Sequence, residues 1–389
     1  MTLSKIFIRA TKYYFWFMLA LFATWVYAEP SLIPAPPSLD AKSYILIDAN
    51  SGKVLVEHNA DQVLPPASLT KIMTSYVAAH EIVNGNVSIA DSVRISVKAW
   101  RKGGSKMYIK EGNFVALEDL LRGIIIQSGN DASIAVAEHI AGAEDAFADL
   151  MNQHALALGM SNSHFTNATG WPAKNHQTNA RDLAILTRAL IQKFPEHYAM
   201  YSEKDYTYNK IKQRNRNLLL WRDSSVDGVK TGHTEEAGYC LVASAQKDSM
   251  RLISVVMGAK SMEARAVESQ KLLTFGFRFY ETHQAIAAND VLNESKIWMG
   301  AIDSLKLGVS NAVVITIPRG KADSLNAELD IDTQIRAPIS KGTTYGHLTL
   351  KLNDEIVAEQ PLVALEDVEK GGLFKLLWHF VYLFVLGLF

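Results

Sequence analysis

The chain has 389 residues, of which 48% are hydrophobic and 20% are charged, and its formal net charge is -1. This composition excludes a disordered or collagen-like chain and is long enough for two ordinary globular domains. The near-neutral charge and the lack of zinc-finger, P-loop or dinucleotide-binding spacing exclude nucleic acid as an expected partner.

The first residues have the pattern of an export signal. Lys5, Arg9 and Lys12 precede an apolar run over 13–26, and Ala28 stands where a signal peptidase reads a small residue. We therefore predict a signal peptide at 1–28, with an uncleaved anchoring helix as the alternative. Four prolines between residues 29 and 39 predict an extended arm over 29–42.

The segment 43–283 mixes strand and helix patterns and is the predicted catalytic domain. Apolar runs at 44–47 and 54–56 flank a Gly-containing turn and predict a β-hairpin. The stretch 227–257 also predicts strands, and Cys240, the only cysteine, is expected to be buried there. Helical spacing begins at Leu69, and further helices are expected at 117–126, 131–142, 144–158, 180–193 and 263–279.

Residues 284–368 have a different texture and predict a small all-β domain. An apolar run at 313–317 is followed by alternation from Ala327 to Ile335 and by a second alternating run at 347–352. Each of these patterns is typical of short strands.

The chain ends in an apolar run within 371–389, in which Lys375, His379 and Tyr382 share one narrow helical face. From Leu373 onward a helix would span about 26 Å, which is less than the roughly 30 Å hydrocarbon core of a bilayer. We therefore predict an amphipathic helix lying in the membrane interface. The alternative is a helix packed on the protein's own body, because so many exposed apolar side chains are unusual.

Ser68 and Lys71 stand where the first predicted helix begins. A serine at such a place is commonly only the N-cap of the helix. Lys71 disfavours that simple role, because a cation in the first turn opposes the helix dipole at a cost of about 0.3–1 kcal/mol. The same field and burial would lower the lysine pKa, and a spacing of three places both side chains on one face. A neutral Lys71 amine is therefore a candidate base for a nucleophilic Ser68.

Two more short motifs lie in a turn and at a strand end, which are places that can present side chains to a cleft. Ser128-Gly129-Asn130 lies in a turn before a predicted helix, and Lys230-Thr231-Gly232 ends a predicted strand. Gly232 removes a side chain where an extended substrate would approach the backbone. An ordinary helix connection and an ordinary strand end are the alternatives for these two motifs.

Ser-x-x-Lys, Ser-Asp-Asn and Lys-Thr-Gly in this order form the motif set of penicillin-binding proteins and class A β-lactamases. Here the middle motif is Ser-Gly-Asn instead, and with this departure the sequence resembles the low-molecular-mass penicillin-binding proteins of type 5 and 6, the serine D-alanyl-D-alanine carboxypeptidases. The resemblance extends over nearly the whole chain, since export signal, catalytic domain, small β domain and C-terminal helix occur in the order of that family. It implies an α+β fold in which an antiparallel sheet is flanked by helices, with Lys230-Thr231-Gly232 on an edge strand.

The resemblance also implies a role for each motif residue. Ser68 is the acylated nucleophile and Lys71 its general base. The backbone N–H groups of Ser68 and His233 form the oxyanion hole. Arg265 matches an arginine near the substrate carboxylate, with a surface helix charge as the alternative. The remaining implied site residues are Ser128 and Asn130 for the proton path and the substrate amide, and Lys230, Thr231 and Gly232 around the terminal carboxylate.

The implied reaction removes the last D-alanine from peptidoglycan pentapeptide stems, with β-lactams as acylating inhibitors and no metal or organic cofactor. The implied location is the periplasm, on the inner membrane surface through the C-terminal helix. A murein D,D-endopeptidase and a non-catalytic penicillin-binding sensor or scaffold remain alternatives. A β-lactamase is disfavoured, because no glutamate lies between Phe165 and Asp182 to hold a deacylating water.

Overall fold

The structure is a computed structural model that describes residues 33–386. The predicted signal peptide at 1–28 therefore lies outside the described residues. Within the described part, residues 33–42 contain neither helix nor strand, and the first strand begins at Ser43.

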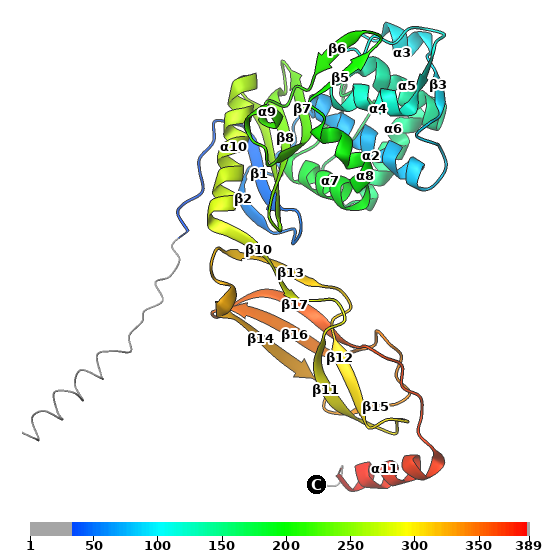
Figure 1. Cartoon of the computed structure of the whole chain (residues 1–389), viewed down its shortest axis with the longest axis vertical. Helices are drawn as coiled ribbons and strands as arrows, with labels where there is room; N and C mark the ends of the chain where they lie inside the picture. The colour runs from blue at the N-terminus through cyan, green and yellow to red at the C-terminus, as the bar shows by residue number, and fades with distance from the viewer. Residues whose placement is uncertain (1–32, 387–389) are drawn as a thin grey trace, which may run out of the picture. The chain divides into compact units, whose positions relative to one another are not determined.

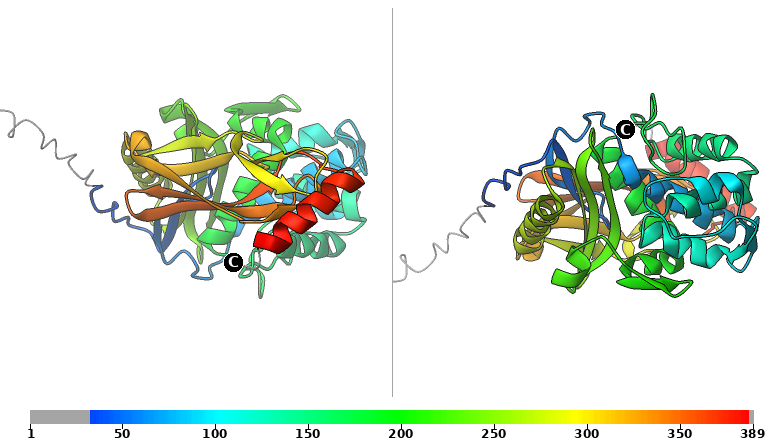
Figure 2. Two further views of the ribbon diagram at one scale, coloured as in Figure 1. Left: turned by 90° about the horizontal axis from the view of Figure 1, so that it is seen from below. Right: turned by 90° about the horizontal axis from the view of Figure 1, so that it is seen from above.

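The catalytic domain is built on one antiparallel sheet of five strands in the order β2-β1-β9-β8-β7. The predicted hairpin is confirmed, since β1 pairs with β2. Every residue of β1 is buried, which indicates that both faces of the sheet are covered. Helix α10 covers one face and a cluster of helices covers the other (Figures 1 and 2). The bounds are β1 Ser43–Asp48, β2 Val54–His58, β7 Val226–Thr234, β8 Gly238–Lys247, β9 Met250–Ala259 and α10 Met262–Phe279.

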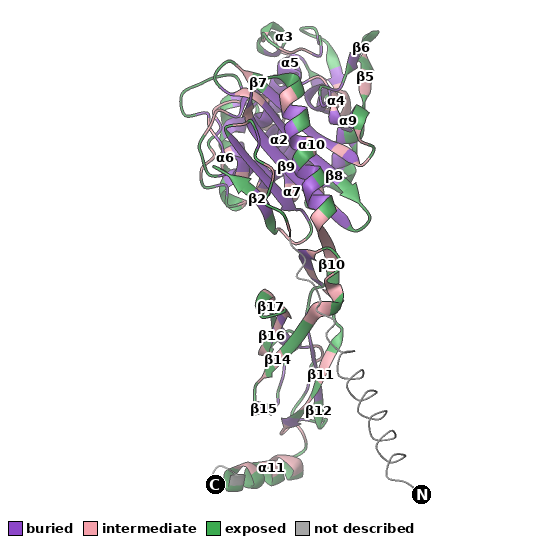
Figure 3. Cartoon of the chain, turned by 90° about the vertical axis from the view of Figure 1, so that its left-hand side faces the viewer, coloured by how far each residue is buried: buried purple, intermediate pink, exposed green. Residues whose placement is uncertain are grey.

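Helix α2 (Thr70–Val83) lies at the centre of the helical cluster, where it contacts α4, α5, α6 and α7. Its apolar positions Ile72, Met73 and Val77 are fully buried, so the predicted apolar face is confirmed (Figure 3). The other predicted helices are confirmed as α4 Leu117–Ile125, α5 Asn130–Ala141, α6 Glu144–Ala157 and α7 Ala180–Lys193.

Several short elements connect these helices and strands. They are η1 Ala67–Leu69, β3 Ser92–Arg94, α3 Val97–Arg101, β4 Phe114–Ala116, α8 Pro195–Tyr198, η2 Ala199–Ser202, β5 Asp205–Tyr208, β6 Ile211–Arg214 and α9 Leu219–Arg222. Of these, η1 matters most for function, because it carries Ser68 directly into α2.

The C-terminal part from Tyr280 to Ala364 is all-β apart from one short 3-10 turn, η3 (Ala322–Ser324). The alternation from Ala327 to Ile335 does not form one strand, because β14 and β15 lie at opposite edges of a six-stranded sheet in the order β14-β16-β17-β12-β11-β15. A separate pair is formed by β10 and β13. The bounds are β10 Tyr280–Ile286, β11 Val291–Trp298, β12 Ser304–Gly308, β13 Val313–Pro318, β14 Leu325–Ile331, β15 Ile335–Arg336, β16 Thr344–Leu352 and β17 Glu355–Ala364.

Helix α11 (Leu373–Leu386) follows the all-β part. Its polar face contacts that part: Lys375 pairs with Asp303 at 2.7 Å, and the Met299 N–H donates to His379 Nδ1 at 2.8 Å. Among the described residues, no helix combines the length and the apolar character needed to cross a membrane.

The chain segment before Ser68 is packed against the loop at 166–171. Gly170 has a left-handed backbone (φ +79°), and a Cβ atom at this position would collide with the main-chain oxygen of Ala67. Two segments that are about a hundred residues apart therefore approach at a distance that only glycine allows.

We expect Gly170→Ala to lower the free energy of unfolding more than Gly85→Ala. Both glycines have left-handed φ angles, +79° and +74°, so both variants carry the same conformational penalty of about 1–2 kcal/mol. Only at position 170 does the new methyl group meet another segment, since nothing lies within 4 Å at position 85. Urea denaturation should show a further loss of about 1–3 kcal/mol for Gly170→Ala. Equal losses would contradict this close packing.

Candidate active site

The sequence motifs meet at Ser68, which lies where two hollows of about 770 and 470 Å³ join. Ser128, Thr231 and Gly232 line the larger hollow, and Asn130 lines the smaller one. Lys71 is hydrogen-bonded to Ser68, and Lys230 is hydrogen-bonded to Ser128. The structure therefore brings together all the predicted site residues: Ser68, Lys71, Ser128, Asn130, Lys230, Thr231, Gly232, His233 and Arg265.

The Lys71 amine is buried, with 1% of the residue exposed, and it contacts three oxygen atoms. Nζ lies 3.1 Å from Ser68 Oγ and 2.8 Å from Asn130 Oδ1, and it also donates to the main-chain oxygen of Thr169. The last two oxygens are carbonyls, which only accept hydrogen bonds. A neutral amine has two N–H donors for these carbonyls, and its lone pair then faces the Ser68 hydroxyl. This geometry is the one a general base requires.

The environment of Lys71 favours this neutral form. Burial, and then the positive charge of Arg216, lower the pKa of Lys71 to about 7, with Asp131 acting in the opposite direction. Desolvation disfavours the charged form of a lysine, and a second cation adds to this effect. A large fraction of the Lys71 amines is therefore unprotonated near neutral pH.

A second buried lysine supports Ser128. Lys230 Nζ donates to Ser128 Oγ at 2.9 Å and to the main-chain oxygen of Thr231 at 3.0 Å. Burial, followed by the charge of Lys71 and of two arginines, lowers the pKa of Lys230 well below its usual value. The Ser128 hydroxyl therefore lies beside an amine whose charged form is disfavoured, as it is at Lys71.

The larger hollow is suited to an anion. Four arginine residues line it, and no Asp or Glu side chain of the described residues does. A carboxylate that entered this hollow would meet guanidinium groups and the Thr231 hydroxyl, which are good partners for it. The arginines are Arg214, Arg216, Arg222 and Arg265.

Ser68 and Ser128 both lie at places where a non-glycine residue has a left-handed backbone. Ala67, which precedes Ser68, has φ 48°, and Ser128 itself has φ 66°. Such residues carry a strain of about 1–3 kcal/mol, which the surrounding contacts must balance. Around Ser128 these contacts come from α5: the Asn130 N–H donates to Ser105 O at 2.8 Å, and the buried Asp131 carboxylate accepts from the Met107 N–H at 2.9 Å.

The Lys-Thr-Gly segment lies on β7, at the edge of the sheet, and its glycine has a structural reason. A Cβ atom at position 232 would lie 3.1 Å from Pro66 O and 3.2 Å from Leu69 N. Gly232 therefore lets β7 approach the turn that carries Ser68, in addition to any approach by a substrate. Arg265 is buried and donates to Gly232 O at 3.1 Å, so it is not a surface helix charge.

The side chain of His233 is exposed and packs on the Tyr239 ring, with the two centroids 4.0 Å apart. His233 lines both hollows beside Ser68, and no hydrogen bond joins its side chain to Ser68 among the described residues. The part of His233 that the sequence assigns to the site is its backbone N–H.

Three further residues contribute to the site although no sequence motif predicts them. Arg216 lies in a polar loop and is exposed at the rim of the larger hollow. Thr169 contributes only its main-chain oxygen. His176 accepts from the Thr166 N–H through Nδ1, so its Nε2–H donates to Thr70 Oγ1, which in turn donates to Ala67 O. Burial lowers the pKa of His176 to about 4, and the neutral ring thus holds the turn before Ser68.

The chain is similar to known proteins over most of its length. Residues 31–261 match the family model described as D-alanyl-D-alanine carboxypeptidase, and residues 280–370 match the C-terminal domain of penicillin-binding protein 5. The D-alanyl-D-alanine carboxypeptidase DacC of Escherichia coli is 45% identical over 93% of this chain and 92% of its own length.

Two solved structures are also similar to this chain. Penicillin-binding protein 5 from Haemophilus influenzae is 42% identical, with a TM-score of 0.84 over 87% of this chain and all of that one. Penicillin-binding protein D2 from Listeria monocytogenes, solved in the ampicillin-bound form, is 31% identical, with a TM-score of 0.58 over 63% of this chain and all of that one.

We expect the Lys71 amine to titrate near pH 7, about three units below an ordinary lysine. Nuclear magnetic resonance of lysines labelled at the ε-carbon measures this directly, and Lys71→Met identifies the signal by its loss. Arg216→Gln should move the midpoint to higher pH, because it removes a cation that disfavours the ammonium form. Arg222→Gln is the matched control, since Arg222 lines the same hollow but pairs with Glu263 at 2.7 Å. A midpoint near pH 10 would contradict the neutral amine.

Proposed function

Because the chain belongs to the D-alanyl-D-alanine carboxypeptidase family, we propose that it removes the terminal D-alanine from peptidoglycan pentapeptide stems through an acyl-enzyme on Ser68. One observation carries the assignment of the nucleophile. Lys71 Nζ lies 3.1 Å from Ser68 Oγ and also contacts two carbonyl oxygens, so a neutral amine that donates to the carbonyls turns its lone pair toward Ser68.

The reaction then has two steps. Ser68 Oγ attacks the carbonyl carbon between the two D-alanines as Lys71 takes the hydroxyl proton, and the C–N bond breaks with that proton passing to the leaving amine. Water then attacks the ester, and the proton it loses returns to Ser68 Oγ. The stem is one residue shorter, and the enzyme is restored.

Ser128 is placed to pass the proton toward the leaving amine, because its hydroxyl accepts from Lys230 at 2.9 Å and lines the same hollow as Ser68. Asn130 fixes the Lys71 amine through Oδ1 and is itself held by a bond from Nδ2 to Gly103 O at 2.8 Å. We assign the oxyanion hole to the backbone N–H groups of Ser68 and His233, because donors fixed in advance stabilise the developing charge.

The terminal carboxylate of the substrate belongs in the arginine-lined hollow, beside Thr231. A free carboxylate distinguishes the end of a stem from a peptide bond further along it, so this hollow favours a carboxypeptidase over an endopeptidase. Lys230 and Arg265 fix the β7 segment beside this hollow, since both side chains are buried and both donate to main-chain oxygens of β7.

A β-lactam presents a strained amide and a carboxylate in similar positions, so we propose that it acylates Ser68 as well. The ampicillin-bound relative supports this proposal. Slow release of the acyl group is expected, because no glutamate between Phe165 and Asp182 is available to activate a water.

We expect the purified chain to release D-alanine from a diacetyl-Lys-D-Ala-D-Ala peptide and from pentapeptide muropeptides. Ser68→Ala should abolish release and also penicillin labelling. Lys71→Arg should reduce release by about 100-fold or more, because a guanidinium is not a base near neutral pH. Chromatography of the products decides between the alternatives.

Cleavage of cross-linked dimers without D-alanine release would indicate an endopeptidase, and binding of penicillin without any product would indicate a sensor or scaffold. Penicillin labelling that survives Ser68→Ala would show that the nucleophile is another residue. Ser202→Ala is the control variant, since this serine is exposed and lies outside both hollows.

We further propose that the protein acts in the periplasm on the surface of the inner membrane, held there by α11. The polar face of α11 contacts the all-β part through Lys375, which leaves the apolar face exposed, with Phe374 at 92% and Trp378 at 70% (Figure 3). An apolar helix face with aromatic residues is typical of a helix that lies in the membrane interface.

Deletion of residues 371–389 should release the chain from phospholipid vesicles and leave D-alanine release unchanged. The double variant Phe374→Ser and Trp378→Ser should weaken vesicle binding, because it removes exposed apolar area. Lys375→Ala is the control, because this side chain pairs with Asp303 of the all-β part and adds no exposed apolar area, so this variant should retain binding. A truncated chain that still sediments with vesicles would contradict the role of α11.

A further inference from the structure

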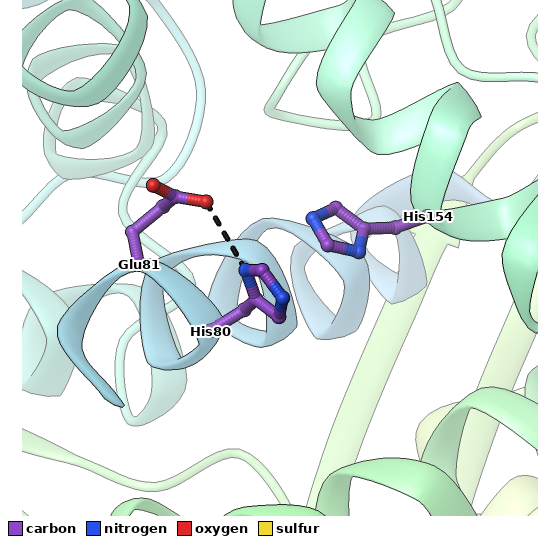
Figure 4. Close-up of side chains that lie close together, drawn as sticks. All are labelled: His80, Glu81 and His154. Atoms are coloured by element: carbon purple, nitrogen blue, oxygen red, sulfur yellow. Dashed lines mark hydrogen bonds and ion pairs between the residues drawn. The ribbon is translucent and has the colours of Figure 1, made fainter. Parts of the chain in front are cut away.

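Two histidines and a glutamate meet on the side of the helical cluster, away from Ser68. His80 and Glu81 belong to the last turn of α2, and His154 belongs to the last turn of α6. Figure 4 shows the three side chains pointing toward one another across the gap between these helices. His80 lies nine residues after Lys71, which is about 14 Å along the helix axis, so the cluster is separate from the proposed catalytic machinery.

The geometry of the cluster is that of a coordination site. One ligand atom from each of the three residues lies within 4.8 Å of the other two, and His80 Nδ1 is 3.1 Å from Glu81 Oε1. Ligand atoms around one tetrahedral zinc ion are about 3.4 Å apart at a Zn–N distance of 2.0–2.1 Å. Side-chain rotations that bring the ligand atoms closer by up to about 1.4 Å therefore close the site.

The outer contacts of the cluster orient its carboxylate. Asn86 Nδ2 donates to Glu81 Oε2 at 2.6 Å, so that Oε1 is left facing the histidines. Such contacts are what fixes the ligands of natural metal sites. The His80 and His154 rings pack edge to face with their centroids 4.5 Å apart, and Phe194 packs against the His80 ring.

The ends of the two helices favour the binding of a cation at the cluster. Both α2 and α6 end beside the cluster, and the C-terminal end of a helix carries about half a negative charge. A cation between the two helix ends is stabilised by both dipoles. Lys193 opposes this effect, since its charge also acts on the His154 ring.

We propose that His80, Glu81 and His154 bind one divalent transition-metal ion of the zinc type, with water completing the coordination shell. Two imidazoles and one carboxylate match the ligand preference of Zn²⁺, whereas Mg²⁺ and Ca²⁺ prefer oxygen ligands alone. The ion ties α2 to α6. It has a structural role, because the cluster is remote from Ser68.

Isothermal titration calorimetry of ZnCl₂ into the purified, tag-free and metal-stripped chain in detergent tests this proposal. We expect one zinc ion per chain, no competition from excess Mg²⁺, and at least tenfold weaker binding in His154→Gln and in Glu81→Gln. His347→Gln is the matched control, because His347 is an exposed histidine on β16 outside the cluster, and it should retain the binding.

A thermal melt of each metal-free variant shows whether it is folded, so a loss of binding is not confused with a loss of structure. Zinc should raise the melting temperature of the native chain and of His347→Gln, and not that of His154→Gln. D-alanine release by folded His154→Gln should equal that of the native chain, which separates this proposal from the proposed function. No zinc binding to the native chain at 100-micromolar metal, or equal binding by His154→Gln, would overturn the proposal.

Discussion

The chemistry that we propose for this protein depends on one desolvated amine. Lys71 is almost completely buried, and two carbonyl oxygens lie beside its amine. An exposed lysine would be protonated at neutral pH and could not accept a proton from a serine. Burial of α2 in the middle of the helical cluster therefore does more than stabilise the fold, because the same packing lowers the pKa of the base.

The tertiary structure keeps this amine in place by bringing distant segments to it. Asn130 approaches from the start of α5, and the Thr169 carbonyl approaches from the loop in which Gly170 packs against Ala67. The strained backbone at Ala67 and Ser128 is stabilised by buried hydrogen bonds, among them those of Asp131. Strain of this kind persists only where the surroundings over-determine it. Contacts between distant segments therefore hold the site in place, and the conformational preferences of the single segments contribute little.

Patterns within one segment predict much of this molecule. The hairpin, the long helices and the strands β13, β14 and β16 of the all-β part follow from the periodicity of apolar residues, and the motifs at Ser68, Ser128 and Lys230 follow from their spacing. The division of 327–335 into β14 and β15 does not follow from periodicity, because both halves have the same alternation. Only their pairing with different neighbouring strands separates them. Thr169 leaves no trace in the sequence, since any residue has a carbonyl group. His80 and His154 are far apart in the chain, and only the packing of α2 on α6 brings them together.

In the proposed mechanism, the two buried lysines link substrate binding to proton transfer. The charge of Lys71 lowers the pKa of Lys230, and the charge of Arg216 lowers the pKa of both lysines. A substrate carboxylate in the arginine-lined hollow offsets part of this positive field, and in a low-dielectric site such an effect is strong. In the proposed mechanism, the carboxylate therefore raises the proton affinity of Lys71 as the substrate enters. It then stabilises the ammonium ion that forms when the amine takes the Ser68 proton.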